Sequence, residues 1–146
     1  MQIRSVSDED FEAVSDLLGE LGRPAVTPST HSACLGVFAA QLADPSCDHL
    51  IARDDDGRAV GFCSLHFRGR LNQPTHEAWI PDLIVTEGAR GAGVGRALLE
   101  EARRRAAERG CHQLTLESGH ERRRAHGVYE AAGLIHTGRA YGQRLP

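Results

Sequence analysis

The most constraining feature of the sequence is a run of alternating glycines, residues 91–95, placed directly before a long helical pattern. The segment 89–95 reads ARGAGVG, and helix-favouring residues follow it as far as Arg109. The first amide groups of a helix lack intrahelical acceptors and lie at the positive end of its dipole. Glycines let a ligand approach the backbone closely and adopt loop angles that other residues resist. A strand, a glycine loop and a helix start in that order predict a phosphate site.

Two familiar phosphate motifs fit this loop poorly. A nucleoside-triphosphate loop needs a lysine and a hydroxyl residue after its last glycine, and neither is present. A dinucleotide fingerprint needs G-x-G-x-x-G, whereas Gly91, Gly93 and Gly95 give G-x-G-x-G, with Arg96 in the position of the third glycine. Glu117 ends the next predicted strand and could act as the ribose-binding acid, so a dinucleotide-dependent oxidoreductase is kept as an alternative.

Length and composition predict one soluble domain over residues 1–146. The chain has 40% hydrophobic and 25% charged residues, which is typical of a globular protein. Its net charge of −3 and its aromatic content of 5% argue against nucleic acid as a partner. No apolar run approaches the roughly 18 residues needed to span a bilayer. The N-terminus turns acidic too early for a signal peptide, so we expect a cytoplasmic protein with no membrane partner.

The cysteines and histidines predict no metal site. The four cysteines are scattered through the sequence and are expected to be free thiols. His120 and His126 do not have a usual zinc spacing, and the cysteines offer no partner pair. A metal would require His66 or His76 to be brought close by folding, and we expect cleft and surface histidines instead.

Hydrophobic periodicity and turn residues predict an α/β chain with the order β-α-α-β-β-β-α-β-α-β. A mixed sheet covered by helices follows from this order. Pro81 lies inside one expected strand and predicts a bulge or an opening of the ladder there. The expected elements are a strand at 2–6, a helix from Ser7 to Gly22, a helix from Pro28 or Ser29 to Leu42, a hairpin at 48–70 with its turn at 54–57, a strand at 76–85, a helix at 93–109, a strand at 111–118, a helix at 122–132 and a last strand or hairpin at 134–145.

The glycine loop resembles the coenzyme-A motif of the GNAT N-acetyltransferase superfamily, R/Q-x-x-G-x-G/A, with Arg90, Gly93 and Gly95 at its fixed positions. Downstream, VYEAAGL at 128–134 is similar to the family's helix with a tyrosine and a following glycine turn. The resemblance implies the GNAT fold, a mixed and mostly antiparallel twisted sheet with helices on both faces. The segment 122–134 looks most like small-molecule acetyltransferases, including those that act on aminoalkylphosphonates.

The resemblance implies acetyl-CoA as the donor, with its pyrophosphate over the glycine loop and its pantetheine arm along the preceding strand. Many family members carry an asparagine where this chain has Arg122, so contacts there would become an arginine–phosphate pairing. The second arginine run raises the hypothesis that Arg122 or Arg124 contacts a coenzyme phosphate or an acidic substrate. The residues expected to bind the donor are Leu83, Ile84, Val85, Arg90, Gly91, Ala92, Gly93, Val94, Gly95, Arg96 and Arg122.

The chemistry implied by the resemblance is direct attack of a primary amine on the thioester. Tyr129 occupies the family's position for the acid that protonates the leaving thiolate. A carboxylate must take the proton of the amine, and Glu117, Asp82 and Glu77 are the candidates. The acceptor is expected to be a small molecule and the assembly a homodimer. A non-catalytic acyl-CoA sensor is the third alternative.

Overall fold

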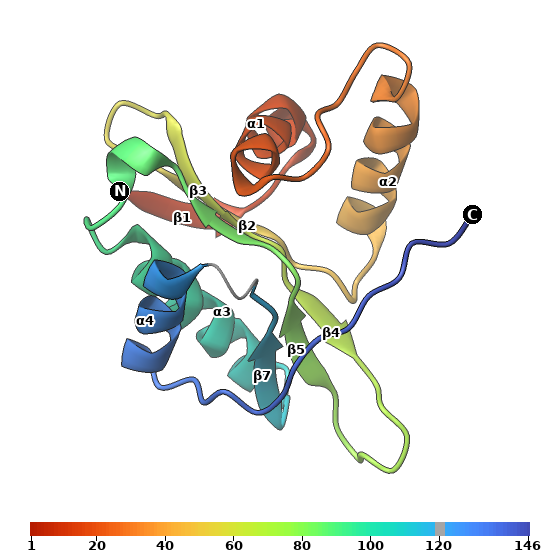
Figure 1. Cartoon of the computed structure of the whole chain (residues 1–146), viewed down its shortest axis with the longest axis vertical. Helices are drawn as coiled ribbons and strands as arrows, with labels where there is room; N and C mark the ends of the chain where they lie inside the picture. The colour runs from red at the N-terminus through yellow and green to blue at the C-terminus, as the bar shows by residue number, and fades with distance from the viewer. Residues whose placement is uncertain (119–121) are drawn as a thin grey trace.

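A computed structural model describes residues 1–118 and 122–146 and shows a twisted sheet with helices on both faces (Figure 1). The predicted fold class is confirmed, and so is the predicted order of elements as far as the last helix, except that the three strands expected between the second and third helices are divided into five. The elements are β1 Gln2–Ser5, α1 Phe11–Leu21, α2 His31–Ala43, β2 Leu50–Arg53, β3 Ala59–Cys63, β4 His66–Arg68, β5 Glu77–Ile80, β6 Leu83–Val85, α3 Val94–Glu108, β7 Gln113–Leu116 and α4 Arg123–Ala131. Short 3-10 turns at Asp8–Asp10 and Glu87–Ala89 precede α1 and α3.

The strands form two sheets, and the chain passes directly from one to the other between β3 and β4 and between β5 and β6. One has the order β1-β2-β3-β6 and the other the order β4-β5-β7. All pairs are antiparallel except β5 and β7, which are parallel. Since β6 continues the path of β5 but pairs only with β3, its second edge is paired with no described strand. The sheet therefore opens between β6 and the end of β7.

The sheet divides at Pro81, as its position in the sequence predicted. Asp82 and Ser64 bracket the break, because the Ser64 amide donates to the Asp82 carbonyl at 2.9 Å and the Asp82 amide donates to Ser64 Oγ at 2.8 Å. The hairpin expected at 48–70 is broken at the same level, between β3 and β4. The Leu65 amide there donates to His49 Nδ1 at 3.0 Å instead of to a strand.

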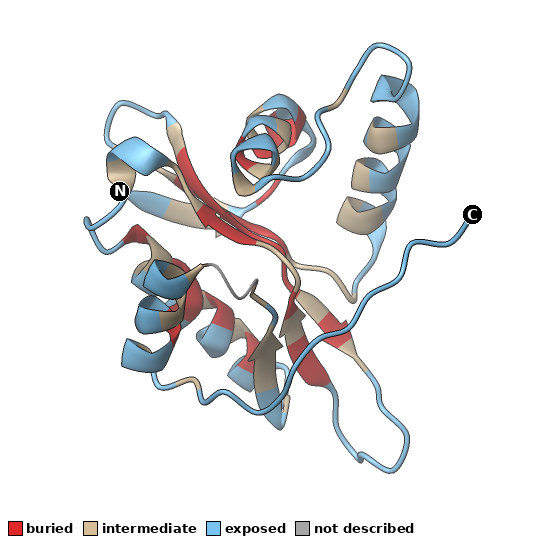
Figure 2. Cartoon of the chain, viewed as in Figure 1, coloured by how far each residue is buried: buried red, intermediate tan, exposed pale blue. Residues whose placement is uncertain are grey.

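Helices α1 and α3 form the two main layers on the sheet (Figures 1 and 2). Val14 and Leu17 of α1 pack on Ile51, Phe62 and Ile84. The opposite face of the sheet is covered by α3, whose buried residues are Val94, Leu98, Leu99, Ala102 and Ala106.

Gly61 of β3 fixes how closely α3 approaches the sheet. A Cβ at Gly61 would lie 2.9 Å from Leu98 Cδ1 and 3.0 Å from Val94 Cγ1, so a side chain there would force α3 outward. The first turn of α3, and with it the glycine loop, is therefore held close to β3 and β6.

Asp10 ties the N-terminal helix to the first two strands. Its carboxylate is 1% exposed and accepts hydrogen bonds from Arg4 Nη1 at 2.7 Å and from Arg53 Nη2 at 2.7 Å. The Ser7 amide also donates to it at 2.8 Å, which closes the turn before α1. The strand β1, the strand β2 and the start of α1 thus share one buried anion.

Two peripheral segments differ from the expectations. Helix α2 begins at His31, after a turn in which the Thr27 amide donates to Thr30 Oγ1, and it contains no buried residue. The strand expected at 134–145 is wrong, because the described residues after α4 form no strand. Gly138 and Gly142 weaken strand pairing. The apolar side chains of this segment also do not pack against the rest of the protein, since Ile135, Tyr141 and Leu145 are 83%, 90% and 83% exposed.

Candidate functional site

The glycine loop runs from the end of β6 into α3 in a conformation that only glycine adopts easily. Gly91 has φ +85° and Gly93 has φ +82°, both in the left-handed region. Gly93 caps α3, so the amides of the first helical turn lack intrahelical acceptors. The loop therefore presents backbone amides at a helix start, which is the geometry that an anion site needs, and anion binding there stays a prediction.

The arginines around this loop have different roles. Arg90 Nε donates to the Val85 carbonyl at 3.1 Å and so ties the loop back to β6. Arg96 Nε donates to Glu100 at 2.9 Å along the exposed face of α3. Arg124 of α4 is the cation that faces the loop, because its Nη2 lies 3.7 Å from where a Cβ of Gly91 would stand. In residues 1–118 and 122–146 the Arg124 side chain has no hydrogen bond or ion pair.

The donor-binding residues expected on β6 lie along the opening of the sheet. Leu83 and Ile84 are buried and pair with Cys63 and Phe62 of β3, and Val85 is half-buried. Gly95 brings α3 against this strand, since a Cβ there would meet Val85 Cγ2 at 3.5 Å. The open edge of β6 and the glycine loop therefore form one continuous backbone surface.

Tyr129 lies where this surface meets the divided sheet. Its side chain comes from α4, is 7% exposed and belongs to the main core. Burial raises the pKa of the Tyr129 phenol, although Arg122 and Ser118 oppose this shift. Arg122 thus lies beside the phenol, whereas Arg124 lies beside Gly91. A phenol with a raised pKa keeps its proton at neutral pH, as a general acid requires.

The three candidate bases have different surroundings. Glu77 is 0% exposed and accepts hydrogen bonds from Arg68 Nε at 2.6 Å and Gln113 Nε2 at 2.8 Å. Burial alone would raise the pKa of Glu77, but these bonds and one from Arg70 lower it. Such a carboxylate, fixed by three donors, is a poor proton acceptor. Glu117 is exposed just after β7.

Asp82 lies at the break itself. Its carboxylate is 19% exposed and accepts a hydrogen bond from Arg23 Nε at 2.7 Å. Cys63 pairs with Leu83 and precedes Ser64, which hydrogen-bonds to Asp82, and it packs with Tyr129 in the main core. A candidate base and a candidate acid therefore lie near the same buried thiol.

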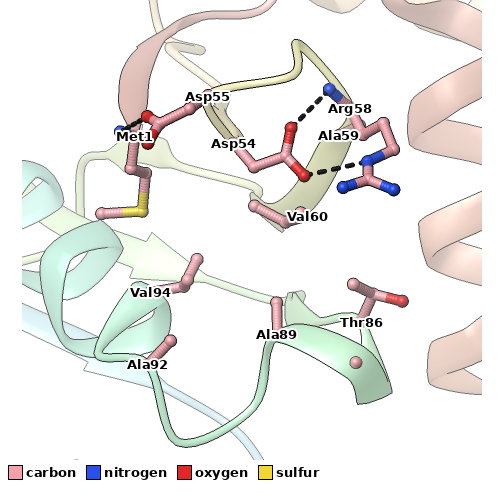
Figure 3. Close-up of a pocket in the computed structure, with 11 residues that line it drawn as sticks. Met1, Asp54, Asp55, Arg58, Ala59, Val60, Thr86, Ala89, Ala92 and Val94 are labelled. Carbon is pink, nitrogen blue, oxygen red and sulfur yellow. Dashed lines mark hydrogen bonds and ion pairs between the residues drawn. The ribbon is translucent and has the colours of Figure 1, made fainter.

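Two open hollows lie next to these elements. One, of about 520 Å³, separates the β2–β3 turn from the segment 86–94, and its charged rim is paired within itself through Met1 with Asp55 and Arg58 with Asp54 (Figure 3). It borders the glycine loop through Ala92 and Val94. The other, of about 720 Å³, lies between α1 and α2 and is lined by the carboxylates of Glu12, Asp16 and Glu20.

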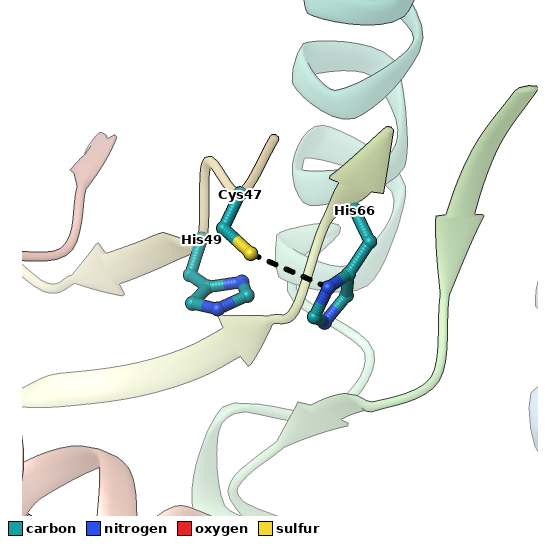
Figure 4. A group of neighbouring side chains, drawn as sticks. All are labelled: Cys47, His49 and His66. Atoms are coloured by element: carbon teal, nitrogen blue, oxygen red, sulfur yellow. Dashed lines mark hydrogen bonds between the residues drawn. The ribbon is translucent and has the colours of Figure 1, made fainter. Parts of the chain in front are cut away.

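A cluster that the sequence did not indicate lies on the other side of the break. Ligand-type atoms of Cys47, His49 and His66 come within 4.8 Å of one another (Figure 4). Cys47 and His66 form an isolated antiparallel bridge, and Cys47 Sγ lies 3.4 Å from His66 Nδ1. A pair of residues 19 positions apart gives no local signal; only the C-x-H spacing of Cys47 and His49 could have drawn attention. His76 does not join the cluster, and His120 is outside the described residues.

The two histidines and the one cysteine of the cluster are neutral at pH 7. Burial lowers the pKa of His49 to about 4, and burial also lowers the pKa of His66. Burial raises the pKa of the Cys47 thiol, and nearby Asp44 raises it further. All four cysteines are free thiols, as expected.

In the described part of the chain, no helix is both long enough and apolar enough to cross a membrane.

Comparisons with known proteins agree with this geometry. Residues 11–134 match the acetyltransferase (GNAT) family model. The aminoalkylphosphonate N-acetyltransferase of Salmonella typhimurium is 30% identical over 132 residues, which is 90% of this chain and 83% of that protein. The aminoglycoside N(6')-acetyltransferase type 1 of Stenotrophomonas maltophilia is 31% identical over 108 residues, 72% of this chain and 71% of that protein.

Structural similarity covers almost the whole chain. The structure of AAC(6')-Iy in complex with the bisubstrate analogue CoA-S-monomethyl-acetylneamine superposes with a TM-score of 0.83 and 22% identity, over 99% of this chain and 97% of that chain. The dinucleotide-dependent alternative finds no support in these matches. The resemblance stated from ARGAGVG and VYEAAGL is confirmed, and the chain belongs to the GNAT acetyltransferase family of enzymes.

Proposed function

We propose that the protein transfers the acetyl group of acetyl-CoA to the primary amine of a small molecule, with Tyr129 as general acid and Asp82 as general base. The observation that carries the proposal is the buried Tyr129 side chain, which packs in the same core as Leu83 of β6 and Val94 at the start of α3. Acetyl-CoA fits the donor side, because the glycine loop offers amides and Arg124 offers a cation without an ion-pair partner in the described chain. The open edge of β6 suits the amides of a pantetheine arm.

The proposed roles follow from the surroundings of each group. An alkylammonium must lose a proton before it can attack the thioester, and Asp82 is the candidate carboxylate nearest to the break. The Tyr129 phenol is protonated at neutral pH, and burial raises its pKa further, so it can give its proton to the departing thiolate. Glu77 is given a structural role, since Arg68, Arg70 and Gln113 bind a carboxylate that is closed to solvent. Asp82 also has partners, Arg23 and Ser64, but its side chain stays 19% exposed. Glu117 serves as the comparison in tests of the base.

The charges of the side chains near the candidate bases and beside α1 favour a small cationic amine as the acceptor. Two arginines lie beside the candidate bases, and both are neutralised by ion pairs: Arg23 with Asp82 and Arg68 with Glu77. The hollow beside α1 is lined by carboxylates, which favour the approach of cationic amines. The relatives' printed substrates, aminoalkylphosphonates and aminoglycosides, are both primary amines. A cytoplasmic location, a single domain over 1–146 and a homodimer stay predictions.

The proposal is tested by thiol release from acetyl-CoA across a panel of aminophosphonates, aminoglycosides, polyamines and peptides, with acetylated products identified by mass. We expect turnover with at least one small primary amine, and a larger loss of activity in Asp82→Asn than in Glu117→Gln. Tight acetyl-CoA binding without turnover of any amine would favour the non-catalytic sensor. Turnover of peptides alone would move the acceptor from small molecules to proteins.

The donor side gives a separate prediction. Arg124→Glu is expected to raise the KM for acetyl-CoA roughly tenfold or more, because a hydrogen bond to a charged group contributes about 1.5–3 kcal/mol. Arg123→Glu is the matched control, since it makes the same charge change one position earlier on α4. Initial rates at varied acetyl-CoA measure both. Equal shifts in the two variants would show a general charge effect and remove Arg124 from the donor site.

A further inference from the structure

We propose that Cys47, His49 and His66 form a zinc site. Cys47 and His49 lie just before the start of β2, and His66 is the first residue of β4. The site uses none of the residues proposed for the acetyl transfer. Thiolate sulphur and imidazole nitrogen are ligands that zinc prefers.

The backbone places the three ligands on one face. Cys47 and His49 are two residues apart in an extended segment, so their side chains point to the same side. The bridge between Cys47 and His66 sets His66 directly opposite Cys47. The Cys47 sulphur points toward the two imidazole rings, whose centroids are 5.0 Å apart (Figure 4).

The distances are close to those of a tetrahedral site. With Zn–S and Zn–N bonds of about 2.3 Å and 2.0 Å, two ligand atoms of a tetrahedron lie about 3.5 Å apart. Cys47 Sγ and His66 Nδ1 lie 3.4 Å apart. The ligand-type nitrogen of His49 lies within 4.8 Å of the other two ligand atoms, so it must move slightly toward them to complete the site. Three protein ligands leave the fourth position open to water.

His49 already has the outer support that a zinc ligand needs. Its Nδ1 accepts the Leu65 amide at 3.0 Å, so Nε2 carries the ring proton and donates to Gln41 Oε1 at 2.7 Å. Zinc would take the Nδ1 lone pair in place of the Leu65 amide proton, so metal binding must outweigh the cost of leaving that buried amide without its acceptor. The Gln41 hydrogen bond would remain and orient the ring, as second-shell partners of ligating histidines do.

The chemistry of the cluster also suits the ion. Both imidazoles are neutral at pH 7 because burial lowers their pKa values, and the neutral ring is the ligating form. Binding converts the Cys47 thiol to a thiolate and releases one proton. Cys47 and His66 are half-buried, which leaves a path for the ion from solvent.

The test uses Co²⁺ as a spectroscopic substitute for Zn²⁺ on the whole protein after removal of metals by a chelator. We expect one Co²⁺ per chain, a thiolate-to-cobalt charge-transfer band, d–d bands typical of a four-coordinate ion, and displacement by Zn²⁺. Cys47→Ser should lose the charge-transfer band, and His66→Gln should bind at least tenfold more weakly. Cys34→Ser is the matched cysteine control and should keep the full spectrum.

His49 itself is left unchanged, because it also holds the Leu65 amide and its loss could disturb folding. Gln41→Met is used instead and should weaken Co²⁺ binding by roughly 10–100-fold while the sulphur band is retained at saturation. Circular dichroism confirms that each variant is folded. A sulphur band that persists in Cys47→Ser, or no saturable binding at micromolar metal, would overturn the site and leave a hydrogen-bonded thiol–imidazole cluster.

Discussion

Tyr129→Phe is expected to lower kcat by about 100-fold or more and to leave the KM for acetyl-CoA nearly unchanged. General acids typically contribute 10²–10⁴-fold to a reaction, and phenylalanine keeps the buried ring while removing the proton donor. The ring packs in the main core, so the fold should persist. Steady-state rates with varied acetyl-CoA separate the two constants.

The second tyrosine and the leaving group supply the controls. Tyr141 is 90% exposed, and Tyr141→Phe should leave both constants unaltered. An acetyl thioester with a more acidic thiol needs less help from an acid, so the defect of Tyr129→Phe should shrink with such a donor. A defect of the same size for both donors would mean that Tyr129 positions the substrates and does not protonate the thiolate.

Asp10→Ala is expected to lower the free energy of unfolding by about 3 kcal/mol, near the lower end of the range for breaking a buried ion pair. The low end applies because Arg4 and Arg53 are 36% and 26% exposed and can regain water. Asp8→Ala removes an exposed acid from the same short turn and should change stability by less than about 0.5 kcal/mol. Urea unfolding followed by circular dichroism measures both variants.

The same carboxylate gives stability a defined pH dependence. Burial alone would raise the pKa of Asp10, but hydrogen bonds from Arg4 and Arg53 outweigh it and hold the pKa well below its usual value. A depressed folded-state pKa contributes stability that is complete above the unfolded value of about 3.9. This contribution is lost as the pH falls from there through the folded pKa. The Asp10→Ala variant should therefore lose less stability than wild type between neutral and strongly acidic pH.

Features that depend on neighbouring residues were predictable from the sequence. The glycine loop, the helix end at Gly22, the break at Pro81 and the tight turn at 54–57 each follow from a few consecutive residues. Backbone sterics and local hydrogen bonds decide these features, so the sequence carries them directly. The same is true of the two motifs that identified the family.

Features that depend on packing between distant segments were not predictable. Arg124 and Gly91 are brought together only by the docking of α4 on α3, which is why Arg122 was expected at the phosphate and Arg124 was not preferred. The Glu77 carboxylate is held by hydrogen bonds from Arg68 of β4 and Gln113 of β7, and the folding of the chain alone brings these donors to it. The C-terminal segment has the alternating pattern of a strand, but a pattern cannot show whether a partner edge is within reach.

The open edge of β6 has a consequence for handling the protein. An unpaired strand edge is a template for joining another chain, and natural proteins usually cover or blunt such edges. Here β6 is short and is recessed beside α3, but its amides and carbonyls still lack a strand partner among the described residues. A ligand that lies along this edge would act as a removable cover. Preparations kept with coenzyme A should therefore resist aggregation on storage and concentration better than preparations stripped of it.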